Sequence, residues 1–246
     1  MTDFVSTHLA SNVLHVELTR VDKYNALTDA MYADLNRVFA EARVDEDVHV
    51  LLFKGAQGCF CAGNDIGDFL QHPVLSEGSA VLEFLHELAR FDKPLVAAVA
   101  GPAIGVATTF LLHCDLVYAT ASAVFSMPFV NLGISPEAAS TYLLPRHIGY
   151  VRAAELLMLG ERFDAEKARE LGIINAIIPE ESYWEFARQQ AEKLAQKPVN
   201  AMRVTKRLMR ANSDEVHAAI DCEAREFVKL RDSDEARAIF QKFLKK

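Results

Sequence analysis

Apolar side chains recur along the first half of the chain with the periods of strands and helices. Residues 12–19, NVLHVELT, alternate apolar and polar positions, which predicts a half-buried strand. Residues 25–48 carry apolar side chains at a helical period, and Thr28 is the candidate N-cap of that helix. The mostly apolar run 48–55 predicts a second strand. A further helical pattern, LEFLHELARFDKP, should end before Pro94.

The segment 95–100, LVAAVA, is wholly apolar and rich in β-branched valine, as expected in a sheet that is covered on both faces. A turn, GPAIG, an apolar helix, VATTFLLHCD, and a strand, LVYAT, follow it in that order. This β-turn-α-β order predicts a sheet that is at least partly parallel. From Arg152 onward the pattern is helical almost without interruption, so the second half should be mainly α. We expect one large α/β domain, with or without a helical appendage.

Composition and charge narrow the class of protein. The 246 residues are 51% hydrophobic and 24% charged, which is the range of soluble globular proteins, and a net charge of −8 argues against a general nucleic-acid surface. One local exception is the basic set Arg203, Lys206, Arg207 and Arg210, whose spacing of three or four residues places it on one helix face. A solvated surface and a site for a phosphate-bearing ligand both fit that face.

Cysteine spacing and hydropathy give expectations about compartment and metals. The four cysteines include no C-x-x-C pair, and no H-E-x-x-H motif occurs, so we expect reduced thiols and no zinc site. No window of eighteen apolar residues occurs, and the first ten residues lack the pattern of a signal peptide. The last residues, FLKK, are not an S-K-L-type peroxisomal address. We therefore expect a cytoplasmic protein that does not enter a membrane.

Two glycine-containing turns carry the candidate chemistry. The stretch 59–66, CFCAGNDI, and the turn GPAIG both follow strands, and both can present backbone N–H groups that no carbonyl of the chain uses. Gly63 would leave the N–H of Asn64 free, and Gly105 would allow close approach to the N–H of Val106 at a helix start. Each turn alone is better explained as a structural glycine turn. Together, without any G-x-x-x-x-G-K-[ST], G-x-G-x-x-G or G-x-S-x-G motif, they favour stabilisation of an acyl oxyanion.

Four motifs resemble those of the enoyl-CoA hydratase/isomerase (crotonase) superfamily in order and spacing. They are FCAGNDI, AGPAIGVATTFLLHCDLVYA, FVNLGISPEAAS and LGERFDAEKARELGIINAII, and the resemblance runs from about Val13 to Ile178. It implies an α/β fold, the crotonase (ClpP-like) spiral of ββα turns, over residues 1–195, and a C-terminal helical trimerisation region over 196–246. It also implies a homotrimer or dimer of trimers that acts on acyl-CoA thioesters without a metal or redox cofactor, since coenzyme A is part of the substrate.

The resemblance also implies roles for individual residues. The N–H groups of Asn64 and Val106 correspond to the oxyanion hole. The motif around the first turn and an N-terminal loop resemble the segments that contact coenzyme A, and Gly105 and Phe129 belong to the acyl site. The implied substrate-binding set is Lys23, Tyr24, Asn25, Ala62, Gly63, Asp65, Ile66, Gly105 and Phe129.

The acid/base groups distinguish the reactions of this superfamily. Hydratases hold a water between two glutamates, and the corresponding positions here are Thr109 and Phe129, which cannot act as carboxylates. The segment LGISPEAAS instead resembles the NLG…(S/T)xEGG segment of peroxisomal-type Δ3,Δ2-enoyl-CoA isomerases. In that branch a single glutamate, here Glu137, moves a proton from C2 of a 3-enoyl thioester to C4 through a dienolate. Ala138 and Ala139 replace the glycines of that pattern, which we expect to reshape the acyl pocket.

Local features leave alternatives open. Phe125, Met127 and Phe129 could form apolar walls that exclude water and raise the pKa of the base. From local sequence alone, however, Glu137 also fits a first-turn helix glutamate that follows an N-cap Ser135. Hydration of a 2-enoyl-CoA is the alternative reaction. A non-catalytic homologue that binds RNA through the basic helix face is the alternative from another class. The histidines His113 and His147 are expected to be structural.

Overall fold

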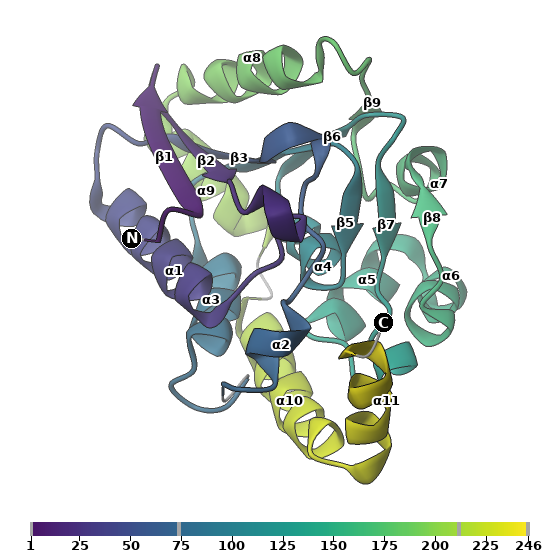
Figure 1. The fold of residues 1–246 in the computed structure, drawn as a ribbon. Helices are drawn as coiled ribbons and strands as arrows, with labels where there is room; N and C mark the ends of the chain where they lie inside the picture. Colours follow the sequence, from purple (N-terminus) through teal and green to yellow (C-terminus); the bar gives the residue numbers. More distant parts are fainter. Residues whose placement is uncertain (1, 73–74, 211–212, 245–246) are drawn as a thin grey trace.

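The computed structural model describes residues 2–72, 75–210 and 213–244 (Figure 1). Its main sheet has six strands in the order β1-β2-β3-β4-β6-β9. The strands β2, β3, β4, β6 and β9 pair in parallel with one another, and β1 pairs antiparallel with β2. The bounds are β1 Val5–Ala10, β2 Val13–Leu18, β3 Val50–Gly55, β4 Leu95–Val99, β6 Leu116–Ala119 and β9 Ala176–Ile177. The expected partly parallel sheet is confirmed.

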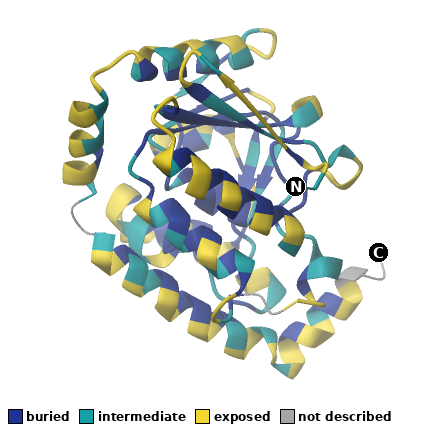
Figure 2. Ribbon diagram, turned by 90° about the vertical axis from the view of Figure 1, so that its left-hand side faces the viewer, coloured by how far each residue is buried: buried dark blue, intermediate teal, exposed yellow. Residues whose placement is uncertain are grey.

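Both faces of this sheet are covered, as the wholly apolar β4 predicts. One face packs Val50, Leu52, Val96 and Ala98 against the alanines of α8 (Tyr183–Ala195), which lies across the sheet in Figure 1. The opposite face packs on α1 (Asp29–Val44), α3 (Ala80–Arg90) and α4 (Val106–Leu111). Figure 2 shows the inner strands buried between half-exposed helices, whereas the edge strand β1 is largely exposed. Every residue of β4 is buried because a parallel strand in such a layer has no solvated side.

The helices α1 and α3 both begin at a side-chain N-cap. Thr28 caps α1, since its side chain accepts a hydrogen bond from the N–H of Met31 at 3.3 Å. Ser79 caps α3 in the same way through the N–H of Leu82. The helix α3 ends at Arg90, before Pro94, as expected.

A second, three-stranded sheet corrects the prediction for the segment GPAIG. Its strands are β5 Pro102–Ile104, β7 Val124–Ser126 and β8 Phe163–Asp164, so GPAIG contains a short strand and is not only a turn. The strand forms because residues 102–104 pair in parallel with 124–126, a partner that is distant in the sequence. The helix after it is also shorter than expected, since α4 ends at Leu111.

The second half is mainly helical, as predicted. Besides α8, its helices before the C-terminal part are α5 Ser140–Ile148, α6 Tyr150–Ala154, a π-helical turn Glu155–Leu159, and α7 Ala165–Glu170. Short 3-10 turns lie at Val21–Lys23, Ala56–Gly58 and Val130–Leu132, and the four-residue helix α2 spans Ile66–Phe69.

The C-terminal helices pack on the body of their own chain. They are α9 Val199–Met209, α10 Ser213–Arg231 and α11 Asp234–Leu244, and they fall within the range 196–246. Phe69 of α2 lies 5.7 Å from Phe227 of α10 and 5.8 Å from Phe240 of α11, measured between ring centroids. The division into a core over 1–195 and a trimerisation region stays a prediction. No helix of the described ranges is long and apolar enough to cross a bilayer.

The basic face of α9 turns toward the protein and is not a solvated stripe. Arg203 Nε donates to Asp92 at 2.8 Å, and the buried Lys206 ammonium donates to Asp115 and to the carbonyl of Lys93, each at 2.7 Å. Arg210 donates to the carbonyl of His113. Three of the four cations therefore attach α9 to the core, and only Arg207 is exposed.

Candidate active site

The two glycine turns lie side by side because their flanking segments pair in parallel. Cys61 forms an isolated parallel bridge with Ala103, in which the N–H of Cys61 donates to the carbonyl of Pro102 at 2.9 Å and the carbonyl of Cys61 accepts from the N–H of Ile104 at 3.0 Å. On each segment a glycine follows this bridge, Gly63 on one and Gly105 on the other, and the N–H groups of Asn64 and Val106 come directly after these glycines.

Glycine is required at both turns. Gly63 has φ +91°, and a Cβ there would lie 2.7 Å from the carbonyl oxygen of Ile104, which would push the two segments apart. Gly105 has φ +59° and ψ −120°, a conformation that residues with a Cβ avoid, although a Cβ there would meet open space. Gly63 therefore permits the close approach, and Gly105 sets the backbone direction.

The N–H groups of Asn64 and Val106 have no acceptor among the hydrogen bonds of the described residues. Leu27 donates to Gly63 at 2.8 Å and accepts from Asp65 at 2.9 Å, so the peptide groups of Asn64 point away from Leu27. Val106 is the first residue of α4, where the helix offers its N–H no partner. Both amides are thus available to a carbonyl oxygen between the turns.

Glu137 is buried, with 2% of its surface exposed. Its Oε1 lies 2.5 Å from the Thr109 hydroxyl, whereas its Oε2 is buried without a partner within the described structure. Burial raises the pKa of Glu137 to about 8; the nearby Glu223 adds to this rise, and the Thr109 hydrogen bond opposes it. A carboxyl group with a pKa near neutrality and one free oxygen is suited to act as a general base and acid.

Thr109 joins the base to the second turn, a role that the sequence did not indicate. It lies three residues after Val106 on α4, and its hydroxyl is 3.2 Å from the carbonyl oxygen of Val106. The carboxyl of Glu137 is therefore at the first turn of the helix that begins with the Val106 amide. The position was recognised only as one where hydratases carry a glutamate. The helical spacing from Val106 is the sequence signal that could have identified it.

Tyr32 of α1 is a second residue that sequence reasoning missed. Its hydroxyl donates to Oδ1 of Asn64 at 2.5 Å. The pKa of this phenol is raised, first by complete burial and then by the charges of Glu137 and Cys61. Tyr32 thus bonds to the first turn from α1, and the charge of Glu137 acts on it.

The backbone around Glu137 differs from the helix start that local sequence suggests. The helix α5 begins at Ser140, after Ala138 and Ala139, which adopt left-handed conformations with φ of 60° and 55°. The N-cap reading of Ser135 is therefore wrong, because two left-handed residues separate Glu137 from the helix. The side chain of Glu137 enters the interior instead of facing solvent at a helix end.

The residues expected to contact coenzyme A come together in part. The carbonyl of Tyr24 accepts a hydrogen bond from the N–H of Ala62 at 2.9 Å, so the N-terminal loop lies against the first turn. Lys23 and Tyr24 are exposed there. Asn25 is fully buried and donates to the carbonyl of Cys59 at 2.7 Å, so its side chain holds the loop in place.

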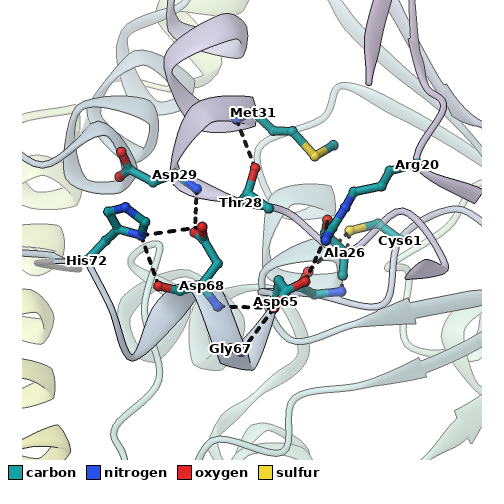
Figure 3. Close-up of polar contacts among 11 residues, drawn as sticks. Arg20, Ala26, Thr28, Asp29, Met31, Cys61, Asp65, Gly67, Asp68 and His72 are labelled. Carbon is teal, nitrogen blue, oxygen red and sulfur yellow. Dashed lines mark hydrogen bonds and ion pairs between the residues drawn. The ribbon is translucent and has the colours of Figure 1, made fainter. Parts of the chain in front are cut away.

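The side chain of Asp65 has a structural role, because it caps α2 and pairs with Arg20. Figure 3 shows its carboxylate capping α2, where it accepts from the N–H groups of Gly67 at 3.0 Å and Asp68 at 3.1 Å. Its other oxygen pairs with Arg20 at 2.8 Å. Ile66, the first residue of α2, is half-buried beside it. The direct contact of Asp65 with coenzyme A stays a prediction.

Three buried apolar side chains lie in β7 and directly after it. Phe125, Met127 and Phe129 are all buried, and the carbonyl of Ser126 accepts a hydrogen bond from the N–H of Gly105 at 2.8 Å. This hydrogen bond places the end of β7 next to the second turn. The position of the second hydratase glutamate is thus occupied by a buried phenyl ring, Phe129.

The two histidines bond to backbone. His113 is buried, and its Nε2 lies 2.8 Å from the carbonyl oxygen of Ala138. Burial lowers its pKa to about 4, so the ring is neutral and donates this hydrogen bond. His147 lies 2.9 Å from the carbonyl oxygen of Gly172. Within the described ranges no group of three or more His, Cys, Asp or Glu side chains is arranged to hold a metal ion.

Comparisons with known proteins agree with this arrangement. The family model for enoyl-CoA hydratase/isomerase matches residues 8–246. Enoyl-CoA delta isomerase 2 of Rattus norvegicus is 36% identical over 213 residues, which are 84% of this chain and 54% of the rat protein, so the chain spans about half of that relative. The 1,2-epoxyphenylacetyl-CoA isomerase of Escherichia coli (strain K12) is 33% identical over 91% of this chain and 88% of that protein. Among solved structures, OdaA of Pseudomonas aeruginosa is 40% identical and covers all of both chains with a TM-score of 0.97.

With the paired turns in place and the family model covering nearly the whole length, the chain belongs to the enoyl-CoA hydratase/isomerase (crotonase) family.

Proposed function

We propose that the protein is a Δ3,Δ2-enoyl-CoA isomerase, which shifts the double bond of a 3-enoyl-CoA to give the trans-2-enoyl-CoA. The thioester oxygen accepts hydrogen bonds from the N–H groups of Asn64 and Val106. Glu137 removes a proton from C2, and the electron pair delocalises over the former double bond and the carbonyl to form a dienolate. The same carboxyl then delivers the proton to C4. No water is consumed, and the enzyme returns to its starting state.

The observation that carries this proposal is the free oxygen of a buried carboxyl group. Oε1 of Glu137 is held by Thr109, and Oε2 has no partner in the described structure. The raised pKa allows one group to accept a proton and return it. A positioned general base contributes about 10²–10⁴ in rate. Removing one oxyanion donor typically costs about 3–4 kcal/mol of transition-state stabilisation.

Hydration is less well supported because the second carboxylate is missing. The two hydratase positions carry Thr109, which is used to bond Glu137, and the buried Phe129. The rat relative named as a delta isomerase supports the isomerase reaction, whereas the E. coli relative shows that similar chains also isomerise other CoA thioesters. RNA binding through the basic face of α9 is also less well supported, since three of the four cations form hydrogen bonds within the chain.

The two reactions can be separated with paired substrates. The purified protein would be incubated with a 3-enoyl-CoA and, separately, with a 2-enoyl-CoA, and the products identified by mass spectrometry and NMR. We expect double-bond migration from the first and little hydration of the second. Glu137→Gln should abolish migration, while Glu166→Gln on the exposed face of α7 should not. Rapid hydration without migration would replace the isomerase assignment by a hydratase. A homotrimer or dimer of trimers is part of the same proposal and is testable by light scattering.

A further inference from the structure

The loop after Glu137 contains two consecutive left-handed alanines. Ala138 and Ala139 have φ of 60° and 55°, and both are completely buried. A left-handed conformation brings the Cβ of an ordinary residue too close to the following carbonyl oxygen, so glycine is usually found there. The related isomerase pattern carries glycines at these two positions, whereas this chain must hold the same turn with alanines.

A carboxylate from a distant helix holds this turn. Glu223 of α10 is buried, and its Oε2 accepts a hydrogen bond from the N–H of Ala139 at 2.6 Å. Its Oε1 accepts from the N–H of Thr141 at 2.9 Å and from the Thr141 hydroxyl at 2.5 Å. These N–H groups belong to the start of α5, where the helix itself supplies no acceptor. Glu223 therefore acts as an N-cap that comes from another helix, 82 residues away from Thr141.

The opposite side of the turn is held by His113. Its Nε2–H donates to the carbonyl oxygen of Ala138, and its own carbonyl accepts from Arg210. Ala138 is thus held by His113, which follows α4, and Ala139 is held by Glu223 of α10. Rotation of either alanine out of the left-handed region would break one of these bonds and turn the carboxyl of Glu137.

We propose that Glu223 is a positioning residue for Glu137: it holds the left-handed turn at Ala138 and Ala139 and thereby aims the catalytic carboxyl. This inference rests on the proposed function, in which Glu137 is the base. Glu223 does not touch the substrate in this arrangement. It acts through the backbone of residues 138–141.

Glu223 also acts through its charge. Its negative charge contributes to the raised pKa of Glu137, after burial. The other titratable groups recorded near the loop are Tyr32 on α1, whose pKa the charge of Glu137 raises, the neutral His113, and Arg210, which bonds to the carbonyl of His113. A neutral glutamine at 223 should therefore lower the pKa of Glu137, in addition to weakening the cap.

The test combines Glu223→Gln with Ala138→Gly and Ala139→Gly. Glutamine retains one acceptor oxygen and loses the other, so kcat should fall about tenfold because the base is misplaced, while KM changes less than about twofold. The glycine pair should restore most of kcat in the Glu223→Gln background, since glycine adopts the turn unaided. Glu226→Gln, on the exposed side of the same helix, is the matched control and should leave both constants unchanged.

A readout that needs no substrate separates this inference from the proposed function. The pKa of Glu137 can be followed by NMR of ¹³C-labelled glutamate, assigned with Glu137→Gln. We expect a lower pKa in Glu223→Gln, and glycine substitution should not reverse it. An unchanged pKa together with an unchanged kcat would overturn the positioning role even if the enzyme isomerises. If Glu223→Gln lowers the pKa of Glu137 but the wild-type protein does not isomerise a 3-enoyl-CoA, the proposed function is overturned. The influence of Glu223 on Glu137 still stands in that case.

Discussion

The Thr109 hydroxyl lies 2.5 Å from Oε1 of Glu137 and 3.2 Å from the carbonyl oxygen of Val106. A hydroxyl has one proton to donate, so it can serve only one of these acceptors at a time. When Glu137 is ionised, Thr109 donates to it. When Oε2 of Glu137 has taken the substrate proton, Oε1 is an uncharged and therefore weaker acceptor, so Thr109 can donate to Val106 instead. The base and the turn that supplies an oxyanion donor are joined by this one side chain.

Thr109→Val tests this link. The hydrogen bond from Thr109 opposes the rise in the pKa of Glu137, so its removal should raise that pKa further above about 8. Because the base acts ionised, kcat/KM should rise with pH through this pKa, and the inflection should move to higher pH in the variant. Activity near pH 7 should fall accordingly. Thr205→Val, on the exposed face of α9, is the control. An inflection at the wild-type position would show that Thr109 does not influence the base.

Gly105→Ala should damage catalysis far more than folding. The conformation at Gly105, φ +59° and ψ −120°, is strained for alanine, and relief of the strain would rotate the peptide that carries the Val106 N–H. Loss of one oxyanion donor predicts a fall in kcat of about 10²–10³. Gly149→Ala provides the comparison, since Gly149 also has a positive φ of 87° and open space for a Cβ. Both variants should lose some thermal stability. Equal losses of kcat would argue against a specific role for the second turn.

Glu137→Gln should stabilise the fold at the expense of activity. The folded-state pKa of Glu137 is raised from 4.5 to about 8, so the favourable protonated form is present below about pH 4.5, and its contribution to stability is lost as the pH rises to about 8. Glutamine is neutral at every pH. The variant should therefore exceed the wild type in unfolding free energy by a margin that grows from about pH 5 to 8 and reaches about 3–5 kcal/mol. Urea unfolding across that range measures the difference. A margin that does not depend on pH would mean that Glu137 titrates normally in the fold.

The fold was largely predictable because its central strands are buried on both faces. Residues 48–55 and 95–100 read as strands from their apolar side chains alone, and Thr28 marked the start of α1. The short strand β5 could not be predicted in the same way. Three residues form a strand there only because β7, about twenty residues later, supplies the partner.

The site was predictable only where a motif fixes the backbone. The two glycine turns lie on segments that pair at Cys61 and Ala103, and the roles of Asn64 and Val106 stay a prediction. Glu137 was ambiguous from local sequence, since two left-handed alanines, which no local pattern reveals, separate it from the helix. Tyr32 and Thr109 were missed because each meets the site from a different helix.

The basic residues of α9 illustrate the limit of charge patterns. Regular spacing correctly placed Arg203, Lys206 and Arg210 on one helix face. The spacing carries no information about the carboxylates that this face meets, such as Asp92 and Asp115. Only the folded chain shows that the face packs inward.

The most direct test of the account is the fate of the C2 proton. A 3-enoyl-CoA carrying deuterium at C2 would be converted by the wild-type protein, and the product would be analysed by NMR for deuterium at C4. Transfer by a single shielded carboxyl group predicts a trans-2-enoyl-CoA in which part of the deuterium has moved to C4, and no conversion by Glu137→Gln. Recovery of unchanged 3-enoyl-CoA from the wild-type protein, or undiminished conversion by Glu137→Gln, would contradict it.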